Sequence, residues 1–210
     1  MSAISQLPIV STLRKILWID TEFDQFALQV FGRNVFAYRK HIIMSFSTKE
    51  CGGQTASSGK FHVSRTTPDD IEPLKQKGYH TEWIERYFAG SPGLCELFTA
   101  WDDESRAAGR IGILYRGGKI TGFNVRNIDA LITDVLVAEK QRRNGCCVQM
   151  IREVCRYLHD EKNIDTVYLL VRVRNTPASL AYKKAGGVEE YQARTFRFCK
   201  INFPLSGYDL

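Results

Sequence analysis

Residues 137–147 read Val-Ala-Glu-Lys-Gln-Arg-Arg-Asn-Gly-Cys-Cys. They follow an apolar segment that predicts a strand, residues 131–137, and they precede an amphipathic helical pattern. A strand, a basic glycine turn and a helix in this order can hold a pyrophosphate, because the unpaired N–H groups of the first helical turn face the anion. Gly145 leaves room for close approach, and Arg142 and Arg143 add positive charge. The alternative is an ordinary helix with a basic start, although cations oppose the helix dipole at this end.

A second segment, residues 175–187, repeats this arrangement nearer the C-terminus. It follows an apolar strand pattern at residues 167–173. Thr176 suits the N-cap and Pro177 the first helical position, while a glycine pair ends the helix. The helix carries a single tyrosine, Tyr182. The sequence therefore predicts two strand–turn–helix units in tandem.

The two segments together resemble the acyl-CoA-binding half of the GNAT superfamily of N-acetyltransferases. The family pattern is a Val, then Arg/Gln-x-x-Gly-x-Gly/Ala, and later Asn-x-x-Ala-x-x-x-Tyr-x-x-x-Gly. Two positions depart from it: Arg143 stands where glycine is common, and Cys147 where Gly or Ala is usual. Cysteine is small, so we expect the pyrophosphate turn to survive. The matching residues are Val137, Arg142, Gly145 and Cys147 in the first part, and Asn175, Ala178, Tyr182 and Gly186 in the second.

The resemblance implies direct transfer of an acetyl group from acetyl-CoA to a primary amine in a ternary complex. Tyr182 is the expected proton donor to the departing thiolate, because a phenol and a thiol have similar pKa values. Backbone N–H groups near Leu136 and Val137 are expected to bind the thioester oxygen and the pantetheine arm. Asn175 is expected either to hydrogen-bond the pantetheine or to fix the second strand exit. The pyrophosphate is expected to lie, mostly on main-chain groups, against Arg142, Arg143, Asn144, Gly145, Cys146 and Cys147.

The attacking amine must lose a proton, and the sequence leaves the base open. Asp134 lies three residues before the end of the motif strand, where some relatives carry a carboxylate, but it suits an ion pair with a neighbouring strand equally well. Glu82, His80 and a water chain are the alternatives. Cys146 and Cys147 are poor covalent nucleophiles, because no histidine is near them in sequence. Their place at a helix N-terminus nevertheless favours lowered pKa values and reaction with alkylating agents.

The composition is that of a globular protein, with 210 residues, 44% of them hydrophobic and 25% charged. The net charge of +6 suits an anionic ligand such as coenzyme A, and without a dense basic block it does not argue for nucleic acid. The six cysteines show no C-x-x-C spacing and the four histidines no ligand cluster. We therefore expect reduced thiols, no metal, no membrane partner and a cytoplasmic location.

From residue 60 onward the pattern predicts the order β-α-α-β-β-β-α-β-α-β-β, which is the order that the resemblance implies. We therefore expect an α+β (α/β/α) fold with a mixed, mostly antiparallel sheet, split at the motif strand, and with helices on both faces. Residues 1–58 are predicted to form a β-rich extension that is a candidate acceptor-substrate region, and residues 59–210 the acetyl-CoA-binding catalytic domain. Residues 47–60 are either a linker or a long loop. The strands predicted in the first third are 14–19, 26–31, 35–38 and 42–46.

Two patterns near the motifs concern packing. The helix after the turn has apolar residues at Cys147, Ile151, Val154, Cys155 and Leu158, which predicts a core-facing stripe. At the C-terminal end, residues 190–203 alternate and then shift phase, which predicts a bulge or a bend near residue 198.

The first third carries a second resemblance. Trp18 is followed by Asp-Thr-Glu-Phe at residues 20–23, and residues 79–90 also match enzymes similar to dTDP-fucosamine acetyltransferase, which acetylate a dTDP-linked 4-amino sugar. The resemblance implies a nucleotide-linked amino sugar as acceptor, and it is compatible with a homodimer. Trp18, Phe23 and Trp83 are equally explained as core aromatics. The alternatives are another small amine or a protein amine as acceptor, or a catalytically silent acyl-CoA-binding regulator.

Overall fold

The computed structural model describes residues 36–53, 60–76, 81–90, 92–120, 123–124, 128–198 and 201–206. The chain divides into two units, one made of residues 42–191 with 209–210 and the other of residues 1–41 with 192–208. In the second unit, the end of β9 (Val188–Phe198) pairs antiparallel with β10 (Ile201–Ser206), and Phe198 faces Ile201 in the register.

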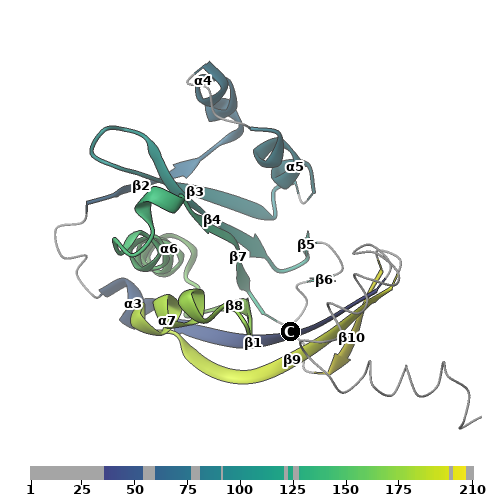
Figure 1. Ribbon diagram of the computed structural model, residues 1–210. Helices are drawn as coiled ribbons and strands as arrows, with labels where there is room; N and C mark the ends of the chain where they lie inside the picture. Colours follow the sequence, from purple (N-terminus) through teal and green to yellow (C-terminus); the bar gives the residue numbers. More distant parts are fainter. Residues whose placement is uncertain are drawn as a thin grey trace, which may run out of the picture. The chain divides into compact units, whose positions relative to one another are not determined.

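The first unit is built on a sheet with the strand order β9-β1-β8-β7-β4-β3-β2 (Figure 1). Strands β2, β3, β4 and β7 form successive antiparallel pairs, and β7 then pairs with β8 in parallel. A parallel pair requires a crossover, which is supplied here by a helix. The strands are β1 (Phe36–Ser47), of which residues 42–47 belong to this unit, β2 (His62–Thr66), β3 (Cys95–Trp101), β4 (Ala107–Tyr115), β7 (Ala130–Val137) and β8 (Thr166–Arg172), and the two-residue strands β5 (Lys119–Ile120) and β6 (Phe123–Asn124) pair separately.

One of the described helices precedes residue 60, and the others are placed between the strands in the order predicted from that residue onward. The helices are α3 (Thr48–Gly53), the 3₁₀ helix η2 (Pro68–Asp70), α4 (Ile71–Gln76), α5 (Glu82–Gly90), the 3₁₀ helix η3 (Glu139–Gln141), α6 (Cys146–Lys162) and α7 (Thr176–Lys184). The mixed sheet of the predicted α+β GNAT fold is confirmed, and so is the order of elements that the two motifs join.

Two glycines of β4 show that helices cover both faces of the sheet. A Cβ added at Gly109 would meet the Met150 side chain of α6 at 3.0 Å, whereas one added at Gly112 would meet the Tyr87 hydroxyl of α5 at 2.4 Å. Positions three apart in a strand point to opposite faces. Helix α6 therefore lies on one face and α5 on the other, as the ribbon also shows (Figure 1).

A hydrophobic core lies on each face. The larger one joins α6, α3 and α7 to the sheet and includes Ile151, Val154, Cys155 and Leu158, which confirms most of the predicted helix stripe; Cys147 is only partly buried. The smaller one lies under α4 and α5 and centres on Leu74, Ile84 and Leu97.

Two local predictions are wrong. Strands predicted at 35–38 and 42–46 form the single strand β1, because Arg39-Lys40-His41 contains no residue that favours a turn. Residues 48–53 of the predicted linker or loop form α3, held by Thr48, whose Oγ1 donates to the Ile164 carbonyl oxygen at 2.6 Å. Of the bulge and the bend predicted near residue 198, the chain has the bend: it reverses direction between β9, which ends at Phe198, and β10, which begins at Ile201. The strands predicted at 14–19 and 26–31 lie outside the described residues.

Candidate functional site

Strand β7 carries an irregularity where the site is expected. Its neighbour β4 pairs Arg110 with Leu136 and Gly112 with Thr133, so β7 has one residue more than β4 between these points. Asp134, within this β-bulge, has φ 48°, a backbone conformation uncommon for a non-glycine residue. The bulge bends the strand and turns the backbone that follows it away from a regular ladder.

The pairing of β7 with β8 stops before the strands end. The parallel register joins Leu131 to Tyr168 and Ile132 to Leu169, whereas β7 continues to Val137. Backbone groups on this edge of β7 after Ile132 therefore have no partner in the β7–β8 register. The Leu136 side chain is 47% exposed. The edge that includes Leu136 and Val137 is thus open to hydrogen-bond an extended ligand, in the way a further strand would.

The turn after β7 has the backbone form that an anion site needs. After η3 the chain takes positive φ at Arg143 (66°) and Gly145 (84°), and residues 142–145 are exposed. Gly145 is the N-cap of α6 and offers no side-chain cap; its carbonyl accepts the Gln149 N–H at 3.0 Å. The N–H groups of the three residues between them therefore lack an intrahelical acceptor.

The surroundings of this helix start suit a negatively charged ligand. The first turn of α6 contains no acidic residue, and no atom lies within 4 Å of the position where a Cβ at Gly145 would be. Arg142 contributes charge at the turn, and its Nη1 lies 3.9 Å from Glu139 Oε1, a long ion pair. A pyrophosphate group fits this open, donor-rich turn.

Cys146 and Cys147 differ from the sequence-based expectation. Burial raises the pKa of each thiol from the ordinary 9.0 to about 12, in the case of Cys147 with a smaller contribution from Cys146. Both thiols are therefore neutral near pH 7. The prediction of lowered pKa values is wrong, because desolvation outweighs the favourable field of the helix start.

The second motif places Asn175 and Tyr182 on α7. Asn175, not Thr176, is the N-cap of α7, and its Oδ1 accepts the Ala178 N–H at 3.4 Å. Pro177 is therefore the second helical residue and not, as predicted, the first. Of the two roles considered for Asn175, this contact supports fixing the strand exit. The Tyr182 side chain is 6% exposed, and burial raises the pKa of its phenol, with a smaller contribution from nearby Cys147. Tyr182 therefore keeps its proton at neutral pH.

Asp134 is engaged in an ion pair. Arg110 of β4 donates from Nε to Asp134 Oδ2 at 2.8 Å and from Nη2 to Oδ1 at 3.4 Å. The cation on a neighbouring strand that the sequence left open as an alternative is thus Arg110. The structure brings Tyr182 close to Cys147 and Asp134 close to Arg110, and no hydrogen bond or ion pair joins these two groups among the described residues.

Sequence reasoning missed the role of Tyr87, which anchors α5 beside the bulge. Its hydroxyl donates to the Ile113 carbonyl oxygen at 3.0 Å and lies 2.9 Å from the Thr133 hydroxyl. Burial raises the Tyr87 pKa, so this group does not act as a base near neutral pH. A tyrosine in a predicted helix gives no signal of this contact, because it depends on the long-range packing of α5 on Gly112.

One candidate base and the aromatic side chains of the second resemblance are not described by the structure. His80, Trp18 and Phe23 lie outside the described residues, and the Trp83 side chain is not described; Glu82 lies in the first turn of α5 and is exposed. Within the described ranges, no group of His, Cys, Asp and Glu is arranged to hold a metal ion. None of the described helices is long and apolar enough to cross a membrane.

Comparison with protein families matches residues 64–187, more than half of the chain, to the Acetyltransferase (GNAT) family. A search of curated proteins finds no match.

Among solved structures, the chain is similar to a conserved protein of unknown function from Staphylococcus epidermidis, with 13% identity, a TM-score of 0.54 and coverage of 86% of this chain and 68% of that one. It is also similar to a putative GNAT acetyltransferase from Novosphingobium aromaticivorans, with 13% identity, a TM-score of 0.50 and coverage of 76% and 64%. A spermidine N-acetyltransferase from Vibrio cholerae has 16% identity, a TM-score of 0.47 and coverage of 66% and 95%. The chain thus spans less than two thirds of the second structure, and likeness at this identity concerns the fold.

Proposed function

Because the chain belongs to the acetyltransferase (GNAT) family, we propose that it transfers an acetyl group from acetyl-CoA to a primary amine by direct attack in a ternary complex. The proposal rests on two features that occur together. The β7–β8 pairing stops before β7 ends, and α6 begins at Gly145 without a side-chain cap. The first offers backbone groups to a pantetheine arm, and the second offers N–H groups to a pyrophosphate.

The coenzyme would lie along residues of the first motif. Leu136 and Val137 would hold the thioester oxygen and the pantetheine arm through main-chain groups. The pyrophosphate would lie at the turn of Arg142, Arg143, Asn144, Gly145, Cys146 and Cys147. The open space at Gly145 and the absence of acidic residues in the first turn of α6 support this placement.

Tyr182 would donate a proton to the sulfur of the departing coenzyme. Its buried phenol is neutral at neutral pH, so the proton is available throughout the working range. Asn175 would act by holding the start of α7, which carries Tyr182, at the end of β8. Asp134 remains the proposed base, and in that role its contact with Arg110 would have to loosen so that the carboxylate can accept a proton from the amine.

For the acceptor, we propose a nucleotide-linked amino sugar, as the resemblance of residues 16–23 and 79–90 implies. Residues 1–58 would contribute to its binding. The alternative acceptor is another small amine or a protein amine, and the non-enzymatic alternative is an acyl-CoA-binding regulator.

The direct test is thiol release from acetyl-CoA with purified protein and a panel of dTDP-4-amino sugars, polyamines and basic peptides. Release with the dTDP-amino sugar alone supports the proposed acceptor. Release with another amine alone retains acetyl transfer and overturns the sugar. Binding of acetyl-CoA without release from any amine supports the regulator, and a chain that does not bind acetyl-CoA overturns the proposal entirely.

A further inference from the structure

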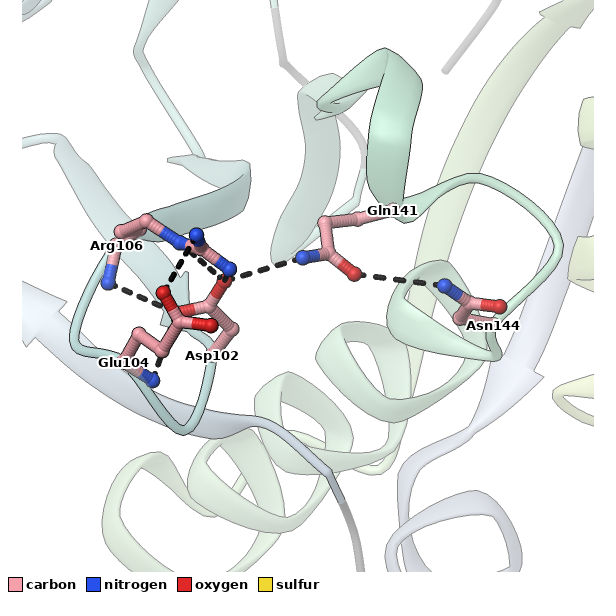
Figure 2. A network of polar contacts seen from close by, with 5 residues as sticks. All are labelled: Asp102, Glu104, Arg106, Gln141 and Asn144. Atoms are coloured by element: carbon pink, nitrogen blue, oxygen red, sulfur yellow. Dashed lines mark hydrogen bonds and ion pairs between the residues drawn. The ribbon is translucent and has the colours of Figure 1, made fainter.

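Asp102 is the centre of a polar network at the β3–β4 turn (Figure 2). Its carboxylate accepts the backbone N–H groups of Glu104 at 3.1 Å and Arg106 at 2.9 Å, and also the Arg106 Nε at 2.9 Å. Its side chain is 10% exposed. These bonds, those from Arg106 above all, hold the Asp102 pKa below its usual range, so the group is a fixed anion near neutral pH.

The same carboxylate reaches a different part of the chain. Gln141 Nε2, at the end of η3, donates to Asp102 Oδ2 at 3.1 Å. Gln141 Oε1 in turn accepts from Asn144 Nδ2 at 3.4 Å, a longer and weaker contact. Because a carboxylate only accepts, it fixes the Gln141 amide with its NH₂ toward Asp102 and its oxygen toward Asn144. Figure 2 shows the three side chains in a row from the hairpin turn to the start of α6.

The segment held by this row is the one that needs restraint. At its beginning the Ala138 N–H donates to the Ala108 carbonyl oxygen at 2.8 Å, on the strand that continues from the Asp102 turn, and at its end the Gly145 carbonyl accepts the Gln149 N–H of α6 at 3.0 Å. Farther along, Arg143 and Gly145 both have positive φ, and residues 142–145 are exposed. An exposed turn with two left-handed residues is readily rearranged unless side-chain contacts hold it.

We propose that Asp102 and Gln141 are positioning residues that preorganise the turn of residues 142–145 for the coenzyme pyrophosphate. The inference rests on the proposed function, since it assigns a role in binding acetyl-CoA. A turn already fixed in its bound form loses less conformational entropy when the anion binds. Neither side chain needs to touch the coenzyme for this effect.

The test compares coenzyme A affinity by calorimetry in the wild type, Gln141→Leu and Glu104→Gln. Gln141→Leu removes both hydrogen bonds of the row at nearly constant size, whereas Glu104→Gln weakens only the ion pair with Arg106 in the same hairpin turn. Loss of one to two hydrogen bonds predicts an affinity lower by roughly 5- to 10-fold for Gln141→Leu. The affinity of Glu104→Gln should equal that of the wild type.

Two further measurements separate positioning from general stability. Gln141→Leu should raise the KM for acetyl-CoA at unchanged kcat with whichever amine is turned over. Hydrogen exchange of the peptide that contains residues 138–145 should be faster than in the wild type, while the thermal midpoint stays close to it. Equal affinity of the wild type and Gln141→Leu would overturn the inference and leave the proposed function intact. Failure of the wild type to bind coenzyme A would overturn the proposed function and this inference with it.

Discussion

At the scale of single residues, Tyr182 has the properties of a proton donor and not of a base. It is 6% exposed, and burial raises the pKa of its phenol. Tyr182→Phe keeps the ring and removes the proton, so kcat should fall by on the order of 10²-fold. The calorimetric affinity for acetyl-CoA should be unchanged, because in the proposed role the hydroxyl acts only on the leaving sulfur. A fully active Tyr182→Phe variant would remove Tyr182 from the reaction.

Arg143 carries a conformational cost that the family pattern avoids. Its φ of 66° lies in the left-handed region, at a position where the family commonly has glycine. Arg143→Gly and Arg143→Ala both remove the charge, but only the alanine keeps the strain. The glycine variant should therefore have a free energy of unfolding about 1 kcal/mol higher than the alanine variant. Urea unfolding of the two proteins measures this difference, and equal stabilities would show that the backbone relaxes.

Single residues of the two motifs also show what sequence patterns can and cannot predict. The positions of Gly145, Asn175 and Tyr182 follow from local motif spacing, and the structure places each on the predicted turn or helix. The thiol pKa values were predicted in the wrong direction. A pattern reveals that a cysteine begins a helix, but burial is set by the elements packed around it, which the pattern does not contain.

At the scale of elements, the start of α6 links burial to pH. Burial raises the Cys146 pKa from 9.0 to about 12, so the folded state holds the proton more tightly than the unfolded state does. Its contribution to stability is then complete below pH 9.0 and is lost as the pH rises from 9.0 toward about 12. Urea unfolding across this range should show a falling free energy. In Cys146→Ala the fall should be shallower by up to ~1.4 kcal/mol per pH unit; an unchanged slope would mean that Cys146 does not titrate in this way.

The contact of α5 with the sheet depends on a glycine. A Cβ at Gly112 would lie 2.4 Å from the Tyr87 hydroxyl oxygen and 2.9 Å from the Thr133 Oγ1. Gly112→Ala should therefore lower the free energy of unfolding by roughly 1–3 kcal/mol. Removing the hydroxyl relieves part of the clash, so Gly112→Ala with Tyr87→Phe should cost less than the sum of the two.

The control for this cycle is Gly90→Ala, in α5 itself, where no atom lies within 4 Å of the added Cβ. It should be close to the wild type in urea unfolding. Additive losses for Gly112→Ala and Tyr87→Phe would show that α5 is held to the bulge by other contacts.

Element order was predictable where motifs or hydrophobic periodicity were strong, as in β7, α6 and β8. Helix α3 was not, because its sequence Thr-Lys-Glu-Cys-Gly-Gly has a poor helix propensity. Its formation depends on packing: a Cβ at Gly52 would lie 2.7 Å from the Arg156 Cα of α6, so the glycine permits an approach that fixes the segment. Only the folded chain brings these two positions together.

At the scale of the whole molecule, the first unit places two independent donors of backbone hydrogen bonds on one chain segment, the β7 edge and the α6 start. The sequence predicted both through the first motif. It did not predict the support from the β3–β4 hairpin, since Asp102 and Gln141 are 39 positions apart, Asp102 lies outside both motifs, and Gln141 is not one of the positions that the family pattern specifies. Thus the proposed coenzyme-binding segment was accessible to sequence reasoning, whereas the parts that hold it in place required the fold.

The most direct test of the central claim is calorimetric titration of acetyl-CoA into the wild type, Gly145→Asp and Gly117→Asp. Both glycines have positive φ, 84° and 87°, so the variants impose the same kind of backbone strain, but only the first places a negative charge at the proposed pyrophosphate turn. We expect the wild type and Gly117→Asp to bind, and Gly145→Asp to have an affinity lower by at least ~10-fold, because its charge repels the pyrophosphate and its side chain blocks close approach. Binding of equal strength by Gly145→Asp would contradict the claim that the start of α6 holds the coenzyme.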